Sequence, residues 1–168
     1  MLRPVALALG LAFALSQAAT AATLTFVIGL TGAQEVNSSG TPNQGDPDGF
    51  GVATLTIDDV ALTISWVIQV ANLDAVVAAH IHPGAVGVNG APAVDFGGQL
   101  TGSGLIDADL AAIVANPDGW YVNVHTGTFP AGAIRGQLCD PLTVVPEPAT
   151  LALLGVGAGL LALRRRGA

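Results

Sequence analysis

The sequence predicts an all-β fold: an antiparallel β-sandwich of about seven strands, Greek-key-like, with one short helix. Three observations support this prediction. Apolar and polar residues alternate through the centre of the chain, glycines and prolines mark the corners between the alternating stretches, and about 124 residues lie between two apolar ends. A stretch of that length is expected to bury roughly two-thirds of its unfolded surface around a single core, and short strands at this spacing are typical of a sandwich.

A period of two residues is clearest in the stretch that begins at Leu62, where Leu62 and Ile64 face one side of a strand and Thr63 the other. Asp58 and Asp59 precede this stretch and indicate a tight hairpin turn. The predicted strands, in chain order, are Leu24–Leu30, Phe50–Ile57, Leu62–Val70, Val76–His82, Gly98–Ile106, Tyr121–Thr126 and Ala133–Leu138.

One helix is predicted over Ala108–Ala115. Asp107 or Asp109 can cap its N-terminus, and Leu110 and Ile113 fall on one face. The helix therefore interrupts the strands once, between the fifth and the sixth, and leaves the fold class all-β.

The charge of the chain is unusual, because it has no lysine and only five arginines. Between the two apolar ends, Arg135 stands alone against eleven acids, a formal charge of −10. Such a surface repels phosphate backbones and attracts cations, so nucleic acid is excluded as a partner. Cys139 is the single cysteine, which excludes an intramolecular disulfide.

Residues 1–21 have the pattern of a secretory signal peptide. Arg3 supplies the positive start, Val5–Leu15 the apolar run, and Ala19-Thr20-Ala21 a cleavage site of small residues. Eleven apolar residues are too few to span a bilayer. The sequence therefore predicts export through the Sec translocon, with removal of the segment by signal peptidase.

The C-terminal part has three sections: Val145–Pro148 with two prolines, the apolar run Ala149–Leu163, and the basic group Arg164–Arg166. Fifteen residues of helix cover about 22 Å, less than the roughly 30 Å of a hydrocarbon core. A transmembrane helix across a thin region, with the arginines in the cytoplasm, is one prediction, and a plain single-pass anchor is the other. A helix packed on the domain is disfavoured, because the run is apolar all round.

This tripartite end closely resembles the PEP-CTERM sorting signal of Gram-negative bacteria. The resemblance lies in Pro146-Glu147-Pro148, in Ala149-Thr150-Leu151 directly after it, and in the terminal Arg164, Arg165 and Arg166. It implies transient anchoring in the inner membrane, cleavage near the motif by an exosortase, and release to the cell surface or extracellular matrix. These six proline, glutamate and arginine residues would then be recognised by the sorting machinery.

Several motifs of the central stretch resemble the chordin-type CHRD domain. They are Leu30-Thr31-Gly32-Ala33-Gln34-Glu35-Val36, Ala78-Ala79-His80-Ile81-His82, Gly87-Val88-Asn89-Gly90, Tyr121-Val122-Asn123-Val124-His125-Thr126, and the run from Phe129 to Leu138. The resemblance implies an extracellular β domain of the kind found in chordin, a binder of growth factors. The domain is expected over residues 22–142 and the sorting signal over residues 143–168.

The three histidines of the chain lie in two of the predicted strands. His80 and His82 are two residues apart, so both rings leave one face with Cα atoms about 6.6 Å apart. His125 lies in the strand Tyr121–Thr126. If the two strands are neighbours, the three rings can converge on one copper or zinc ion, metals that imidazole favours. The alternative is that His80 and His82 hydrogen-bond loop carbonyls and hold the loop Pro83–Gly97.

The histidine pattern also resembles copper–zinc superoxide dismutase, a sandwich whose copper ligands include a His-x-His strand pair and a later histidine. The bridging histidine and the zinc loop of that family are missing here. The resemblance therefore implies a copper or zinc site, which could be redox-active with copper, and dismutase activity is not expected.

Two other parts of the sequence could form sites, an acidic loop and Arg135. Asp46 and Asp48 lie in a polar loop that faintly resembles a calcium loop, although no glutamate follows at the EF-hand spacing. Arg135, inside a predicted strand, is expected to form a structural ion pair with a buried carboxylate, or to bond carbonyl groups.

No Ser-His-Asp order, phosphate loop or paired-carboxylate motif is present. The favoured function is therefore non-enzymatic: an exported protein of the cell surface or matrix whose domain binds a polysaccharide or another protein. The alternative is an exported copper- or zinc-binding protein.

Overall fold

The computed structural model describes residues 22–139 and 142–144. The predicted signal peptide, the PEP motif, the apolar run and the three C-terminal arginines lie outside these ranges. Within them, no helix has the length and apolar character needed to cross a membrane.

The described residues form one antiparallel sheet with strand order β5-β4-β7-β8-β1-β2-β3-β6, and β9 pairs with the start of β1. This confirms the all-β prediction. All seven predicted strands are present, and the sheet has two further short strands, β5 and β9. The strands are β1 (Thr23–Thr31), β2 (Phe50–Asp58), β3 (Thr63–Ala71), β4 (Val76–Pro83), β5 (Val94–Asp95), β6 (Thr101–Ile106), β7 (Trp120–Thr126), β8 (Ile134–Gln137) and β9 (Leu142–Val144).

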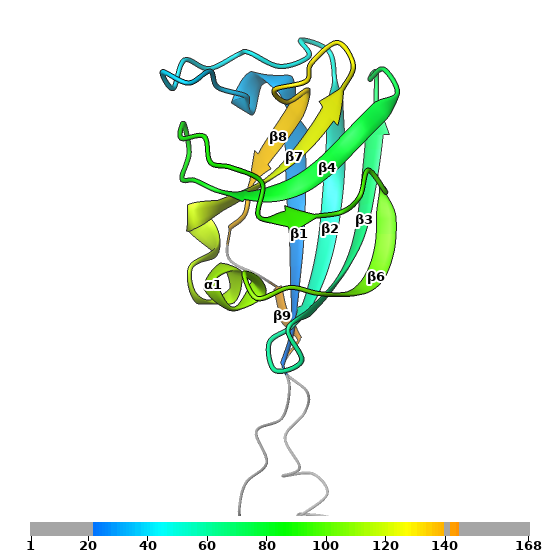
Figure 1. Ribbon diagram of the computed structural model, residues 1–168, viewed down its shortest axis with the longest axis vertical. Coiled ribbons are helices and arrows are strands. Elements are labelled where there is room, and N and C mark those ends of the chain that lie inside the picture. The colour runs from blue at the N-terminus through cyan, green and yellow to red at the C-terminus, as the bar shows by residue number, and fades with distance from the viewer. Residues whose placement is uncertain (1–21, 140–141, 145–168) are drawn as a thin grey trace, which may run out of the picture.

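The predicted sandwich is approximate, because its two layers are halves of one curled sheet. In Figure 1, β4 runs diagonally across the strands β1, β2 and β3. One core cluster joins the halves, with buried residues such as Leu55 from β2 and Ile81 from β4. The segment after β5 spans the gap between the sheet edges: the Phe96 amide donates to Ala79 of β4, and the Ile68 amide of β3 donates to Leu100.

The starts of β3 and β6 lie later than predicted for reasons of backbone conformation. β3 begins at Thr63, because Leu62 adopts a φ of 49° that ends the turn after β2. β6 begins at Thr101, three residues later than predicted, since Gly97 and Gly98 have φ angles of 61° and 71°. The Asp58 carboxylate accepts the amides of the next turn, which confirms the predicted hairpin.

Within residues 22–139 and 142–144, the single α-helix α1 spans Leu110–Ala115, and two short 3₁₀ turns span Gly32–Gln34 and Pro117–Gly119. Leu110 and Ile113 are fully buried, as their common face predicted. The predicted side-chain cap of α1 is absent. Asp109 occupies the cap position without a side-chain bond, while the Asp107 carboxylate accepts the Asp109 amide and forms a local turn before the helix.

The half-sheet of β4, β7 and β8 is buried on both faces, unlike an ordinary surface sheet. Its inner face is apolar, with Ile81, Val122 and Val124 in the core. Its outer face carries histidine, tyrosine, asparagine and arginine side chains, because side chains alternate along each strand. Loops cover this polar face and keep most of its side chains from solvent, among them His82 and Asn123.

Candidate metal centre

Strand pairing brings the three histidines together. β4 and β7 are antiparallel neighbours, in a register that sets His80 opposite Asn123 and His82 opposite Tyr121. His125 lies one pair further along the same face, opposite Ala78. The ring centroid of His80 lies 5.4 Å from that of His82 and 5.0 Å from that of His125. The neighbouring strands that the three-histidine prediction requires are therefore present.

One ring nitrogen of each histidine lies within 4.8 Å of a ring nitrogen of each of the other two. Ligands about 2.0–2.1 Å from a tetrahedral zinc ion are about 3.4 Å apart. Side-chain shifts on the order of 1 Å would therefore bring the three nitrogens to bonding distance. Among the described residues this is the one cluster of at least three His, Cys, Asp or Glu side chains close enough to share an ion.

Hydrogen bonds fix which nitrogens point inward. His82 Nδ1 lies 3.0 Å from the Gly90 carbonyl and His125 Nδ1 lies 3.1 Å from the Pro130 carbonyl. A carbonyl oxygen only accepts, so both Nδ1 atoms carry the proton, and each neutral ring has its lone pair on Nε2. Both Nε2 atoms, like His80 Nδ1, are buried without a hydrogen-bond partner. Each of the three histidines thus has one buried ring nitrogen that is free to bind a ligand.

The outer nitrogen of the third ring also has a partner. His80 Nε2 lies 3.5 Å from the Asp95 carboxylate, which is the cross-strand neighbour of His80 on β5. A carboxylate or carbonyl behind each ligating imidazole is the usual second layer of a metal site, since it orients the ring and raises its basicity. All three histidines have such a partner.

Burial favours the neutral form of two of the rings, His82 and His125. It lowers the pKa of His82 to about 4, against a smaller opposing effect of the bond to Gly90. It lowers the pKa of His125 as well, opposed by the bond to Pro130. Neutral imidazole is the form that binds metal ions. The His80 side chain is 15% exposed, so the cluster is closest to solvent on that side.

The structure also shows part of the alternative role, in which the histidines hold the loop Pro83–Gly97. His82 bonds Gly90 inside that loop. His80, in contrast, contacts Asp95 of β5 rather than a loop carbonyl. The loop bonds use only the outer nitrogens, so they are compatible with a metal at the inner ones.

Arg135 is buried at the edge of the same polar face. Its guanidinium donates to the carbonyls of Ala85 and Val88 and to the side-chain oxygens of Asn89 and Gln137. Of the two kinds of partner predicted for Arg135, the structure shows the carbonyl groups. The expected ion pair is not found among the described residues, and neutral acceptors of the loop take its place.

Asp46 and Asp48 are not brought to a common point with other acids in the described part of the chain. The Asp46 carboxylate accepts the amides of Asp48 and Gly49, so it stabilises the loop turn, while Asp48 is exposed. A structural role for Asp46 thus accounts for this acid without an ion.

Sequence reasoning missed two acidic residues near the histidine face. Glu35 is buried, and burial raises its pKa to about 7, against the charge of Arg135 and a hydrogen bond from Asn123. Asp95 is exposed and is placed beside His80 only by the pairing of β4 with β5. Neither residue could be recognised from a pattern in the sequence. Glu35 is a lone acid near a strand end, and Asp95 lies in β5, which has only two residues.

The fold and the site define a class: an all-β domain with a polar, loop-covered strand face. The chain belongs to the CHRD-domain family, whose model matches residues 26–138. A second model, the PEP-CTERM protein-sorting motif, matches residues 144–166. No curated protein and no solved structure matches the chain significantly.

The resemblances to the CHRD domain and to the PEP-CTERM sorting signal are therefore confirmed. The sorting motif implies a secreted protein of a Gram-negative bacterium, processed by an exosortase and sorted to the cell surface or extracellular space. The description of the matched domain names no ligand.

Proposed function

We propose that this chain is an exported surface protein whose CHRD domain binds one transition-metal ion through His80, His82 and His125. The observation that carries the proposal is the meeting of three histidines that have ring nitrogens within 4.8 Å of one another and that each have one buried ring nitrogen without a hydrogen-bond partner. An unpaired buried polar atom costs about 1–3 kcal/mol. Three such atoms facing one point are accounted for by an ion that binds all of them.

Copper is the favoured metal and zinc the second. Neutral imidazoles select late first-row metals over calcium or magnesium, and copper binds most tightly among the divalent ions. Three histidines leave at least one coordination position for an external ligand, as in catalytic rather than structural zinc sites. This favours a protein that captures copper outside the cell or uses it in a redox reaction.

The test is a copper titration by calorimetry of the full chain and of His125→Ala, in the presence of millimolar calcium to occupy weak acidic sites. We expect one copper ion per chain and at least about a tenfold loss of affinity in the variant, because a ligand is removed. Asp118→Ala removes an exposed acid elsewhere and should bind copper like the wild type. Equal affinity of the wild type and His125→Ala would assign the histidines a purely structural role.

For the export route, we propose that residues 1–21 are removed by signal peptidase after passage through the Sec translocon. The apolar run 149–163 would then anchor the chain transiently in the inner membrane until an exosortase cleaves near Pro146-Glu147-Pro148. The match of the sorting motif to residues 144–166 supports this route.

Binding to a surface or matrix polymer is a second candidate function, favoured by one observation. The outer face of β1, β2 and β3 carries exposed apolar side chains, and Val27, Phe50, Val52 and Val67 are each more than 40% exposed. Strand pairing sets Val27 and Val67 on either side of Thr54, so they lie on one open face. The test compares the amount of Val52→Asp and of wild-type protein in the matrix fraction, and less of the variant should be retained. Val60→Asp, in the β2–β3 turn, is the control and should leave retention unchanged.

A further inference from the structure

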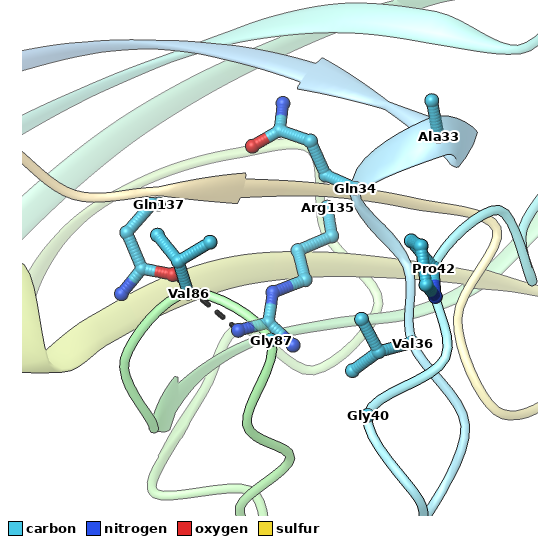
Figure 2. Close-up of a pocket in the computed structure, with 9 residues that line it drawn as sticks. All are labelled: Ala33, Gln34, Val36, Gly40, Pro42, Val86, Gly87, Arg135 and Gln137. Atoms are coloured by element: carbon cyan, nitrogen blue, oxygen red, sulfur yellow. Dashed lines mark hydrogen bonds between the residues drawn. The ribbon is translucent and has the colours of Figure 1, made fainter.

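A cavity of about 370 Å³ lies between two loops on the polar side of the sheet. One wall is the segment after β1, with Ala33, Val36 and Pro42, and the other is the β4–β5 loop, with Val86. Figure 2 shows the Arg135 side chain extending between these walls from β8. The volume lies in the range of small-molecule sites, which are mostly apolar with a few polar groups.

Arg135 gives this apolar cavity a positive charge. It is the only cationic residue that is always charged among the described residues, and it is 1% exposed. Its carbon Cζ lies 3.4 Å from the centre of the Tyr121 ring, so an aromatic face covers one side of the guanidinium. The hydrogen bonds of Arg135 use Nη1 and Nη2, and the Nε–H makes none within the described ranges.

The charge of Arg135 is incompletely balanced. No carboxylate lies within ion-pair distance of it in the described part of the chain. Glu35 is the acid whose charge acts on Arg135, and its pKa of about 7 means that much of it is protonated near neutral pH. A buried charge without an opposite partner is costly, so an anion in the cavity would be stabilised there.

We propose that this cavity binds a small organic acid, with its carboxylate toward the Arg135 guanidinium and its apolar body between Val36, Pro42 and Val86. Guanidinium is suited to carboxylate recognition by charge and by shape. The acidic surface of the domain repels multiply charged anions, which favours a ligand with a single charge. The proposal does not depend on a metal at the histidines.

The probe is phenylacetate, compared with the neutral analogue 2-phenylethanol, and both are titrated into the full chain by ¹H–¹⁵N NMR. We expect phenylacetate to bind with a Kd of about a millimolar. It should bind at least about tenfold more tightly than 2-phenylethanol, with the largest shifts at Arg135 and Val86. Equal binding of the two compounds, or shifts located elsewhere, would overturn the proposal.

A matched pair of variants tests the place of binding. Val86→Asp adds a negative charge at the cavity mouth, on a side chain that is 80% exposed, so the fold should be retained. Val60→Asp adds the same charge at an exposed position in the β2–β3 turn. Val86→Asp should abolish the phenylacetate shifts and Val60→Asp should keep them. Equal binding by the two variants would show that the cavity does not hold the acid.

Discussion

The two nitrogens of each imidazole have different roles at the histidine cluster. The outer nitrogens of His82 and His125 donate to Gly90 and Pro130, and that of His80 contacts Asp95. These contacts orient the rings and place the free lone pairs inward. A histidine that only holds a loop needs one such bond. That role does not explain why the second ring nitrogen is buried without a partner beside two other histidines.

Acid pH should affect the metal-free protein through two opposing residues. The folded pKa of His82 is about 4, below its usual 6.5, so its contribution to stability is lost as pH falls from 6.5 to 4. The folded pKa of Glu35 is about 7, above its usual 4.5, so its contribution is lost as pH rises from 4.5 to 7. Between these limits the two contributions nearly cancel.

Glu35→Gln should therefore expose the effect of the histidine. With EDTA present, we expect the free energy of unfolding of this variant to fall by about 3 kcal/mol between pH 7 and pH 4.5. The wild type should change much less, because its Glu35 compensates. Urea unfolding at the two pH values measures both. An equal pH dependence in the two proteins would contradict the assigned burial of Glu35.

The sequence predicts part of the geometry of the histidine cluster. The spacing of His80 and His82 fixes their common face, because strand side chains alternate. Which nitrogen of His82 and of His125 points inward depends on Gly90 and Pro130, which lie in loops that a periodic pattern does not predict. The burial of Glu35 likewise depends on the loop packing around it.

Among the elements, β5 is the smallest that contributes to the site. Its two residues pair with β4 and set Asp95 beside His80. Since Asp95 is 69% exposed, it contributes little to the core. Its position suits it to orient His80 so that Nδ1 faces the cluster.

Asp95→Ala should weaken copper binding without unfolding the domain. Loss of such a partner typically costs about 10–100-fold in metal affinity, and the exposed contact predicts the lower end. Competition titration with a copper chelator measures the change, with Asp118→Ala as the control for loss of one exposed acid. If both variants bind copper like the wild type, Asp95 does not position His80.

The long strands could be predicted from sequence, because each has one face in the core and so alternates clearly. β2 and β3, for instance, begin and end within one residue of their predicted bounds. The curl of the sheet and the pairing of β8 with both β1 and β7 could not, since alternation says nothing of which strands are neighbours. β5 and β9 are too short to show a period.

For the whole molecule, the folded domain and the sorting signal should be separable. The core cluster spans Leu24 to Leu138, and β9 ends at Val144, two residues before the motif Pro146-Glu147-Pro148. Deleting residues 145–168 should therefore alter where the protein is retained, while its melting temperature stays close to that of the full chain. Cell fractionation and thermal melts measure the two effects.

A longer deletion provides the control. Removing residues 140–168 also removes β9 and its pairing with Thr23–Thr25, so this chain should melt at a lower temperature. If deletion of residues 145–168 alone unfolds the domain, the C-terminal part is structural and the proposed division is wrong.

Copper should also stabilise the whole fold, because it binds the native arrangement of β4 and β7 rather than the unfolded chain. At a free copper concentration of 100 times Kd, the expected gain is about 2.7 kcal/mol. A thermal melt should show a raised midpoint that EDTA reverses. Millimolar calcium should raise the midpoint only weakly, through the acidic surface. A larger shift with calcium than with copper would point to the carboxylates instead.

Copper binding by the three histidines is tested most directly by X-ray absorption spectroscopy at the copper edge, on the protein loaded with one equivalent of copper. Binding by His80, His82 and His125 predicts a first shell of nitrogen at about 2.0 Å, with outer-shell scattering from three imidazoles. A shell of oxygen ligands without imidazole scattering would contradict copper binding by the three histidines.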